Sequence, residues 1–320
     1  MVGVSGSGKT CFVYAMHNYM SIAQNGFIFT AKNPDVDLDL SDGWDQIAYD
    51  GVWPDGTTTS QEYDFYVQYA NTKIMEFSWC DYRGGALLDR STETDTANLL
   101  KRINDSSCLV ITIGADTMKE IIDGNVRKAK EFTRLSNIIN RFSAENGRRI
   151  PIVISLTKAD MYTTDEQKKL LSIIKTYFNI LFVPDADWLV SIIPIQLGSS
   201  LGKNEDGSVS GRIEPRNVQI PVLFFVSAVL REMTTTMSAK LKDISINKSD
   251  YKTKISIENN KGWFSKFWNG DKAPAYVDKV DKLNTDEQAI LKKLPEIEKM
   301  LESMSEQFRV CKMFYKGKEI

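Results

Sequence analysis

Histidine is almost absent from this chain, and its cysteines are unpaired in sequence. His17 is the only histidine among 320 residues, and it falls inside an expected helix, which argues against His-dependent triads and His-rich metal sites. The four cysteines contain no C-x-x-C pair, and Cys11 and Cys80 adjoin two motifs described below. We therefore expect reduced thiols and a cytoplasmic protein.

A strong charge of one sign and long apolar runs are also missing. The net charge is −2, with 42% hydrophobic and 26% charged residues, as in globular proteins. This charge provides no general basic field for nucleic acid, and no apolar run reaches the roughly 18 residues of a membrane span. We expect neither a nucleic-acid partner nor membrane contact.

What the chain does contain is a Gly-rich loop followed at once by an apolar-periodic helix. Residues 3–10 read Gly-Val-Ser-Gly-Ser-Gly-Lys-Thr, a complete phosphate-binding motif of the form G-x-x-x-x-G-K-[ST]. Its glycines let backbone N–H groups turn inward, and the helix directs its positive end at the anion. We expect Lys9 to reach the β- and γ-phosphates and Thr10 to offer its hydroxyl to Mg²⁺. The other expected nucleotide contacts in this segment are Ser5, Gly6, Ser7, Gly8 and Cys11.

The position of this loop predicts a short first strand. Such a loop follows a buried strand, whose mean length is about 5–6 residues, yet Met1 and Val2 alone precede Gly3. We expect most of this strand to be absent from the sheet, through a truncated or misassigned start, with a naturally very short strand as the alternative. Its neighbours would then keep unpaired N–H and C=O groups beside a gap in the core.

Strands and helices are expected to alternate along residues 1–242. Strands are expected at 62–70, 73–80, 108–113, 150–156 and 188–195, and helices at 10–23, 93–104, 126–143, 165–178 and 217–241. A polar, aspartate-rich stretch through Asp50 and a Gly/Ser-rich loop at 198–211 separate some of them. This order predicts an α/β fold with a mainly parallel sheet between helices.

Residues 243–320 are expected to form a C-terminal extension. Trp263–Trp268 holds four large aromatic residues with Lys266 between them, either as a segment packed on the main domain or as a partner or membrane contact. Residues 284–308 read as a charged helix with one apolar stripe, which docks internally or meets a partner helix.

A second motif, Asp81-Tyr82-Arg83-Gly84, stands at the end of an expected strand. There the Asp81 carboxylate can hold Mg²⁺ through water, and the Gly84 N–H can approach a γ-phosphate because no side chain blocks it.

A third motif, Thr157-Lys158-Ala159-Asp160, follows strand 150–156 directly. The Asp160 carboxylate can accept hydrogen bonds from the ring N–H and the exocyclic amine of guanine, a donor pair that adenine lacks. The stem of Lys158 can lie along the base plane. A helix N-cap is the alternative role for Asp160.

These three motifs resemble those of the Ras-like, translation-factor-related P-loop GTPases over roughly residues 1–240. The resemblance implies a three-layer P-loop fold that binds Mg²⁺ and GTP or GDP, with Thr157 where asparagine is usual. Trp53-Pro54-Asp55-Gly56-Thr57 resembles the first switch, whose threonine closes over Mg²⁺. Thr57 is the expected ligand, and Thr58 or Thr59 is the alternative.

The base-contacting loop has two candidates. Gln196-Leu197-Gly198 follows strand 188–195, where that loop belongs, whereas Ser227-Ala228 matches a short signature inside an expected helix. Element order favours Gln196 and Leu197. Together with the segment 213–218, the motifs are similar to those of the bacterial double-GTPase group, which is associated with conflict or defence systems.

Gly85 stands where many small GTPases have a glutamine that orients the attacking water. We therefore expect slow hydrolysis of GTP, with Lys9, Thr57 and Gly84 in the catalytic centre and a protein partner docking on the switch segments or the C-terminal helix. Arg83 and Arg90 could supply positive charge to the transition state of hydrolysis. The alternatives are a non-hydrolysing GTP-gated scaffold and an ATP-using P-loop enzyme.

Overall fold

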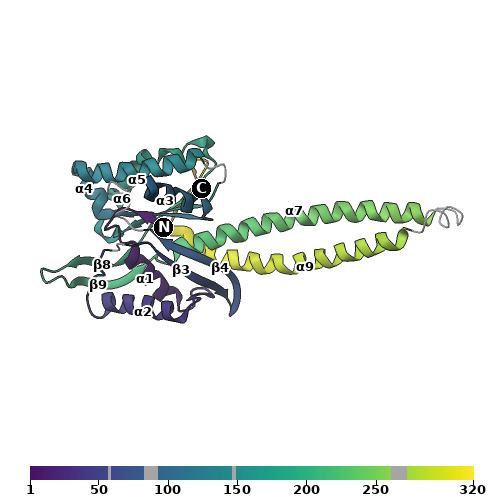
Figure 1. Ribbon diagram of the computed structural model, residues 1–320, viewed down its shortest axis with the longest axis horizontal. Coiled ribbons are helices and arrows are strands. Elements are labelled where there is room, and N and C mark those ends of the chain that lie inside the picture. Colours follow the sequence, from purple (N-terminus) through teal and green to yellow (C-terminus); the bar gives the residue numbers. More distant parts are fainter. Residues whose placement is uncertain (57–58, 83–92, 146–148, 261–271) are drawn as a thin grey trace. The chain divides into compact units, whose positions relative to one another are not determined.

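The computed structural model describes residues 1–56, 59–82, 93–145, 149–260 and 272–320 (Figure 1). It contains two compact units. One comprises Met1–Phe225 with Gln307–Ile320, and the other comprises Val226–Glu306.

The first unit is an α/β structure around a mixed, mostly parallel sheet, as the alternation of elements predicts. The sheet order is β1-β5-β6-β7-β10-β11, in which β1, β5, β6 and β7 pair in parallel and the last two strands are antiparallel. The bounds are β1 Val2–Gly3, β5 Leu109–Gly114, β6 Ile152–Thr157, β7 Leu189–Pro194, β10 Lys312–Tyr315 and β11 Lys318–Glu319. The two antiparallel strands were not expected, because their short, lysine-rich sequence lacks an apolar run.

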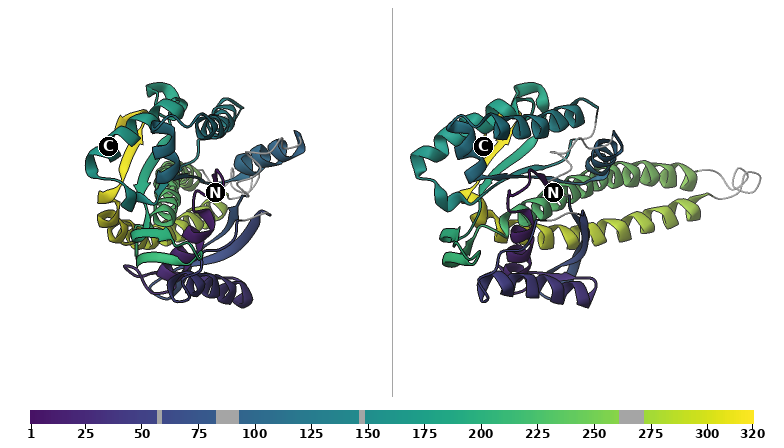
Figure 2. Two further views of the ribbon diagram at one scale, coloured as in Figure 1. Left: turned by 90° about the vertical axis from the view of Figure 1, so that its left-hand side faces the viewer. Right: turned by 60° about the vertical axis from the view of Figure 1, so that its left-hand side comes forward.

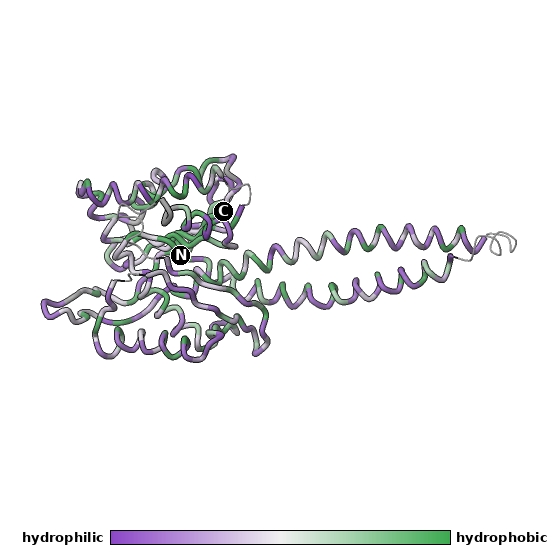
Figure 3. Tube along the Cα trace, viewed as in Figure 1, coloured by the Kyte–Doolittle hydropathy of each residue, from purple (hydrophilic) through white to green (hydrophobic). Residues whose placement is uncertain are grey.

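Strands β5 to β7 are buried on both faces. Alternate residues such as Ile111, Ile154 and Ile192 belong to one apolar cluster, while Val153 and Ile193 between them are also buried. This explains why the strands read as continuous apolar runs rather than alternating ones; they are green in Figure 3. The helices that share this cluster are α3 Glu93–Asp105, the short helix α4 Ala115–Ile122, α5 Val126–Glu145 and α6 Thr164–Tyr177.

A separate antiparallel sheet contains the three strands between β1 and β5. Its order is β2-β3-β4, with bounds Phe27–Ala31, Gln61–Tyr69 and Thr72–Asp81. Helices α1 (Lys9–Met20) and α2 (Pro34–Ala48) pack against each other beside it (Figure 2).

Strand β2 and helix α2 lie in the polar, aspartate-rich stretch up to Asp50, for which the sequence analysis named no strand or helix. Asn33 caps α2 by accepting a hydrogen bond from Asp35 N at 3.0 Å, and Pro34 begins the helix. Asp37 in the first turn accepts from Ala31 N at 2.8 Å and lies 2.7 Å from His17 Nε2. The aspartates therefore start a helix rather than solvate a loop.

The expected loop at 198–211 is instead a two-stranded hairpin, β8 (Gln196–Lys203) and β9 (Val209–Arg216). Its serines and glycines suggest a loop, but the strands pair through their backbones. Asp206 Oδ1 closes the turn by accepting from Ser208 N at 2.9 Å.

The second unit contains most of α7 (Ile220–Asn259) and α9 (Ala273–Ser305). The helix expected to end at 241 continues to Asn259, and residue 242, the predicted domain boundary, lies inside it. Lys248 Nζ of α7 donates to Glu287 Oε2 of α9 at 2.7 Å, and the rings of Tyr251 and Tyr276 stack with centroids 5.9 Å apart. Opposite charges and stacked rings thus join the two helices.

The apolar stripe predicted on residues 284–308 is partly buried: three of its seven apolar residues are buried, three are half-buried and one is exposed. Ile290, Ile297 and Met304 are buried, while Leu291 is exposed. The aromatic segment Trp263–Trp268 lies outside the described residues.

Helix α7 is long and apolar enough to cross a membrane by length and composition alone. It is the one such helix within the described ranges, and 44% of its apolar window is buried in the protein. Core helices of globular proteins meet the same criterion, so this is weak evidence of a membrane span.

Candidate nucleotide-binding site

The Gly-rich loop leaves β1 and turns into α1 at one end of the parallel strands. Gly3 pairs with Thr112 of β5, and a Cβ on Gly3 would lie 2.5 Å from Thr112 O, so only glycine fits. Gly6 and Gly8 have φ of 77° and 78°, in the left-handed region that favours glycine. Gly8 precedes α1 without a side-chain cap. The N–H groups at the start of α1 are therefore left to an external acceptor.

Lys9 folds back over this loop. Its Nζ donates to Gly3 O at 3.0 Å and to Val4 O at 3.2 Å, and its side chain is buried. Burial lowers the pKa of Lys9, and the nearby Asp81 carboxylate opposes this shift. The Lys9 side-chain amine is therefore a hydrogen-bond donor enclosed by the Gly-rich loop.

Asp81 at the end of β4 lies beside Thr10 at the start of α1. Thr10 Oγ1 donates to Asp81 Oδ2 at 3.4 Å, and Asp81 is 1% exposed. Burial raises the pKa of Asp81, while Lys9 and the Met1 ammonium act in the opposite direction. Asp81 Oδ1 is buried without a hydrogen-bond partner in the described part of the chain.

This pair fits an incomplete site for Mg²⁺. The ion commonly takes one or two protein oxygens and completes its shell with water and phosphate oxygens, which agrees with one hydroxyl and one unsatisfied carboxylate oxygen. Within the described ranges, no three His, Cys, Asp or Glu side chains gather as a ligand set. A site of this kind would depend on a bound phosphate.

Thr157 and Lys158 connect the end of β6 to the Gly-rich loop. The Thr157 hydroxyl lies 2.7 Å from Ser7 O and 3.2 Å from Ile113 O. Lys158, with a φ of 55°, directs its Nζ to Gly6 O at 3.2 Å. The first and third sequence motifs are therefore in direct contact.

Asp116, at the start of α4, was missed by the sequence analysis. Its carboxylate forms an ion pair with Lys158. The signal available in the sequence was a carboxylate two residues after the end of a buried strand, at the same sheet edge as the other motifs.

A cavity of about 400 Å³ adjoins these residues. Its lining includes Gly8 of the loop and Cys11 and Phe12 of α1. The other lining residues are Trp53, Asp116, Thr157, Lys158, Asp160, Met161, Ile195, Leu197, Leu201 and Gly202. Burial raises the pKa of Cys11 to about 11, so its thiol is protonated and behaves as a small apolar group at neutral pH.

Asp160 lines the cavity with its carboxylate uncommitted. In the part of the chain that the structure describes, Asp160 forms no hydrogen bond or ion pair, whereas Asp116 is paired with Lys158. Of the two residues predicted to contact the base, Leu197 lines the cavity and Gln196 does not. Trp53, Phe12 and Leu201 are lining residues that the predicted nucleotide contacts did not include.

The remaining predicted site residues lie in the Gly-rich loop or outside the described residues. Ser5 and Gly6 are exposed at the loop, and Ser7 is fully buried. Thr57 and Gly84 lie outside the described residues, as do the alternative ligand Thr58 and the residues Arg83, Gly85 and Arg90.

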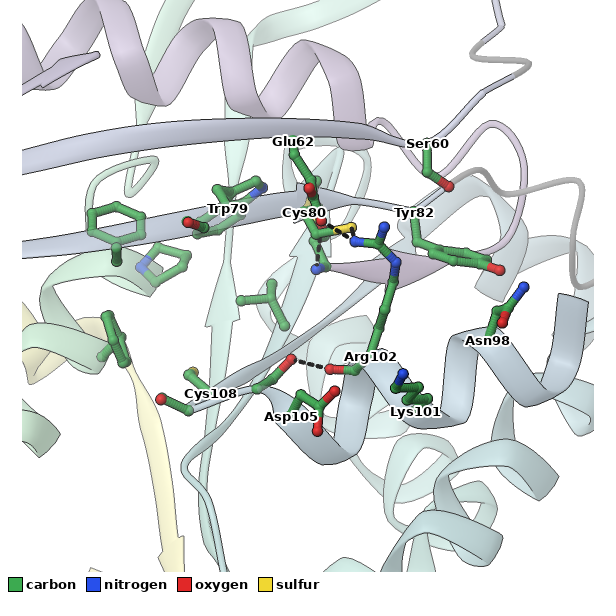
Figure 4. A pocket seen from close by; sticks show the side chains of 18 of the residues that line it. Ser60, Glu62, Trp79, Cys80, Tyr82, Asn98, Lys101, Arg102, Asp105 and Cys108 are labelled. Atoms are coloured by element: carbon green, nitrogen blue, oxygen red, sulfur yellow. Dashed lines mark hydrogen bonds and ion pairs between the residues drawn. The ribbon is translucent and has the colours of Figure 1, made fainter. Parts of the chain in front are cut away.

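A larger cavity, of about 1130 Å³, lies between β4 and β5 next to Met1 (Figure 4). Met1 N donates to Cys80 O at 2.6 Å and Met1 O accepts from Tyr82 N at 3.1 Å, so Met1 joins the end of β4. On its other side, β1 begins to pair with β5 at Val2, opposite Ile111, and Val110 lines the cavity. The backbone of Met1 thus lies between the ends of β4 and β5, beside the cavity.

Comparisons of the chain with protein-family models, with curated proteins and with solved structures found no match.

Proposed function

We propose that this protein binds Mg²⁺ and guanine nucleotides through a P-loop GTPase-type domain and acts as a slow, nucleotide-controlled switch. The observation that carries the proposal is that three features lie together. The uncapped Gly-rich loop, the Thr10–Asp81 pair and the Asp160-lined cavity meet where β1 and β6 of the parallel sheet and β4 of the separate antiparallel sheet end. Ligands of open α/β sheets bind at the carboxyl ends of parallel strands.

Each residue has a distinct role in this proposal. Lys9 would exchange its backbone acceptors for β- and γ-phosphate oxygens, while Thr10 and Asp81 would hold Mg²⁺. A bound Mg²⁺ would supply positive charge that neutralises the phosphate oxygens. Thr57 as a further metal ligand and the Gly84 N–H as γ-phosphate contact remain predictions from sequence.

The cavity supports a base site beside the phosphate site. The apolar side chains of Phe12, Leu197 and Leu201 suit the faces of a base, and Asp160 supplies the acceptor that guanine needs. A cytoplasmic location, a protein partner and membership of the double-GTPase group belong to the same proposal.

Base recognition is tested by Asp160→Asn. The carboxylate accepts from two donors of guanine, whereas an asparagine amide would place one N–H₂ against a donor and suit the O2 acceptor of xanthine. We expect the variant to bind GTP roughly 10- to 150-fold more weakly, since one charge-assisted hydrogen bond contributes about 1.5–3 kcal/mol, and to gain affinity for XTP. Calorimetry with GTP, XTP and ATP measures both changes.

The matched control is Asp185→Asn, an exposed aspartate away from the cavity lining, which should keep the wild-type preference. An unchanged ratio of GTP to XTP affinity in Asp160→Asn would contradict the assignment of the base site. Equal affinity of the wild-type protein for GTP and ATP would favour an ATP-using enzyme.

Hydrolysis is expected to be slow. With Gly85 in place of a water-orienting side chain, single-turnover GTP cleavage should run on the order of 10⁻⁴ to 10⁻³ s⁻¹, the range of an unassisted small GTPase. Chromatography of bound nucleotide over several hours measures the rate. A rate above about 1 s⁻¹ would refute the slow switch, and GTP that stays intact would favour the non-hydrolysing scaffold.

A further inference from the structure

In the β8–β9 hairpin, two glycines stand where the two backbones approach closely. Two register shifts interrupt the ladder of the hairpin. A Cβ on Gly198 would lie 2.0 Å from Arg212 O, and one on Gly211, whose φ is +90°, would lie 2.5 Å from Ser200 O. Any other residue at either position would displace the paired strand. The close approach of the two strands therefore depends on these glycines.

A short segment after α2, Gly51–Trp53, attaches to this hairpin at three points. The carbonyl of its first residue accepts from Val209 N at 2.5 Å, and its second residue forms an antiparallel bridge with Ser208. Trp53 Nε1 donates to Gly202 O at 3.0 Å. The segment thus contacts both strands of the hairpin.

The third of these contacts lies at the cavity. Trp53 and Gly202 both line the cavity, as does Asp160. The hairpin also supplies Leu197 and Leu201 to the same lining. A base that fills the cavity would therefore touch the hairpin and the residue that holds it.

We propose that Gly51–Trp53 is a strut that sets the position of the β8–β9 hairpin as a wall of the base cavity, with Trp53 as the positioning residue. The proposal rests on the guanine-nucleotide site proposed above. The arrangement with the Trp53–Gly202 hydrogen bond encloses the base, so the bond strengthens nucleotide binding. By linkage, a bound nucleotide stabilises the hairpin to the same extent. The conformational stability of the hairpin, including its exposed side, therefore increases when a nucleotide is bound.

The test uses Trp53→Phe, which keeps an aromatic face in the cavity and removes the donor to Gly202 O. We expect the Kd for GTP to rise roughly 2- to 10-fold, the effect of one neutral hydrogen bond. Hydrogen exchange at residues 196–216 is then compared in the free protein and at nucleotide concentrations that saturate each variant. GTP should slow exchange of the hairpin amides in the wild-type protein and much less in Trp53→Phe.

Tyr49→Phe serves as the matched control, because Tyr49 is an aromatic residue 81% exposed and outside the cavity lining. It should behave as wild type. If Trp53→Phe folds, binds GTP and shows the wild-type gain in hairpin protection, the strut is overturned while the nucleotide site stands. If the folded wild-type protein binds no guanine nucleotide, the proposed function itself fails.

Trp53→Ala extends the test by removing the aromatic wall as well as the donor. A base–aromatic contact contributes roughly 5- to 150-fold to affinity on top of the roughly 2- to 10-fold effect of the lost hydrogen bond, so we expect GTP affinity to fall roughly 10- to 1,500-fold, more than in Trp53→Phe. Equal affinities of Trp53→Ala and the wild-type protein would exclude both roles of Trp53.

Discussion

Lys9→Met is expected to remove most Mg·GTP binding, with a rise in Kd of roughly 30- to 4,000-fold. Removing one partner of a buried, hydrogen-bonded charge pair costs about 2–5 kcal/mol, which corresponds to this range. Methionine keeps the length and much of the volume of the lysine stem but provides no donor to phosphate. Calorimetric titration with GTP in the presence of Mg²⁺ measures the change.

Lys168→Met is the matched control, because Lys168 is an exposed lysine on α6 that pairs with Asp165 at 3.0 Å. It should bind GTP as the wild-type protein does. Binding by a folded Lys9→Met variant within threefold of wild type would contradict the role assigned to the Gly-rich loop.

The same substitution has a pH-dependent effect on stability, which separates folding from binding. Burial raises the pKa of Asp81, and Lys9 opposes this shift, so losing Lys9 raises that pKa further. A carboxyl group whose pKa is raised in the folded state stabilises the fold at low pH, and this contribution is lost as the pH rises through the folded value. We expect the loss of stability in Lys9→Met to be largest at neutral pH and to shrink as the pH falls toward 3.8, the ordinary value for this group.

The grouping of the motifs could be predicted from sequence because they are short and local. Residues 3–10 form a complete phosphate-binding motif, and Asp81 and Thr157–Asp160 stand at the ends of strands that an alternating pattern or a continuous apolar run identifies. The parallel strands β1 and β6 bring their carboxyl ends to one edge. Cys11 and Leu197 also lie where that reasoning places them, on the lining of the cavity.

The other features of the site and the fold depend on hydrogen bonds and ion pairs that local sequence patterns do not indicate. Asp116 acquires its role through an ion pair with Lys158, which is 42 residues away. The hairpin formed by β8 and β9 contains serines and glycines whose backbone pairing outweighs their weak strand propensity. In α2, Asn33 caps a helix within an aspartate-rich stretch for which the sequence analysis named no element. Amino-acid composition is therefore a poor guide to secondary structure where backbone pairing stabilises the element.

An apolar strand added before Met1 is expected to raise the thermal stability by about 5–10 °C. Four added residues in a Val-Ile repeat would continue β1 into the cavity of about 1130 Å³ between β4 and β5. Burying each such side chain contributes about 1.5–3 kcal/mol, and ordering each residue opposes it by about 1.5 kcal/mol. A net gain of about 3 kcal/mol corresponds to that shift in a domain of this size.

The extension also changes the chemistry at Met1, and a control must separate the two effects. The Met1 amine is buried, and burial lowers its pKa, so a neutral amide at this position removes the cost of a buried ammonium. A Gly-Ser extension of equal length makes the same amide without apolar side chains and should recover only that part of the gain. Thermal unfolding at one pH compares the three proteins. If the Val-Ile extension were no more stable than the Gly-Ser extension, the cavity would not accept a strand, because the amide alone would account for the change.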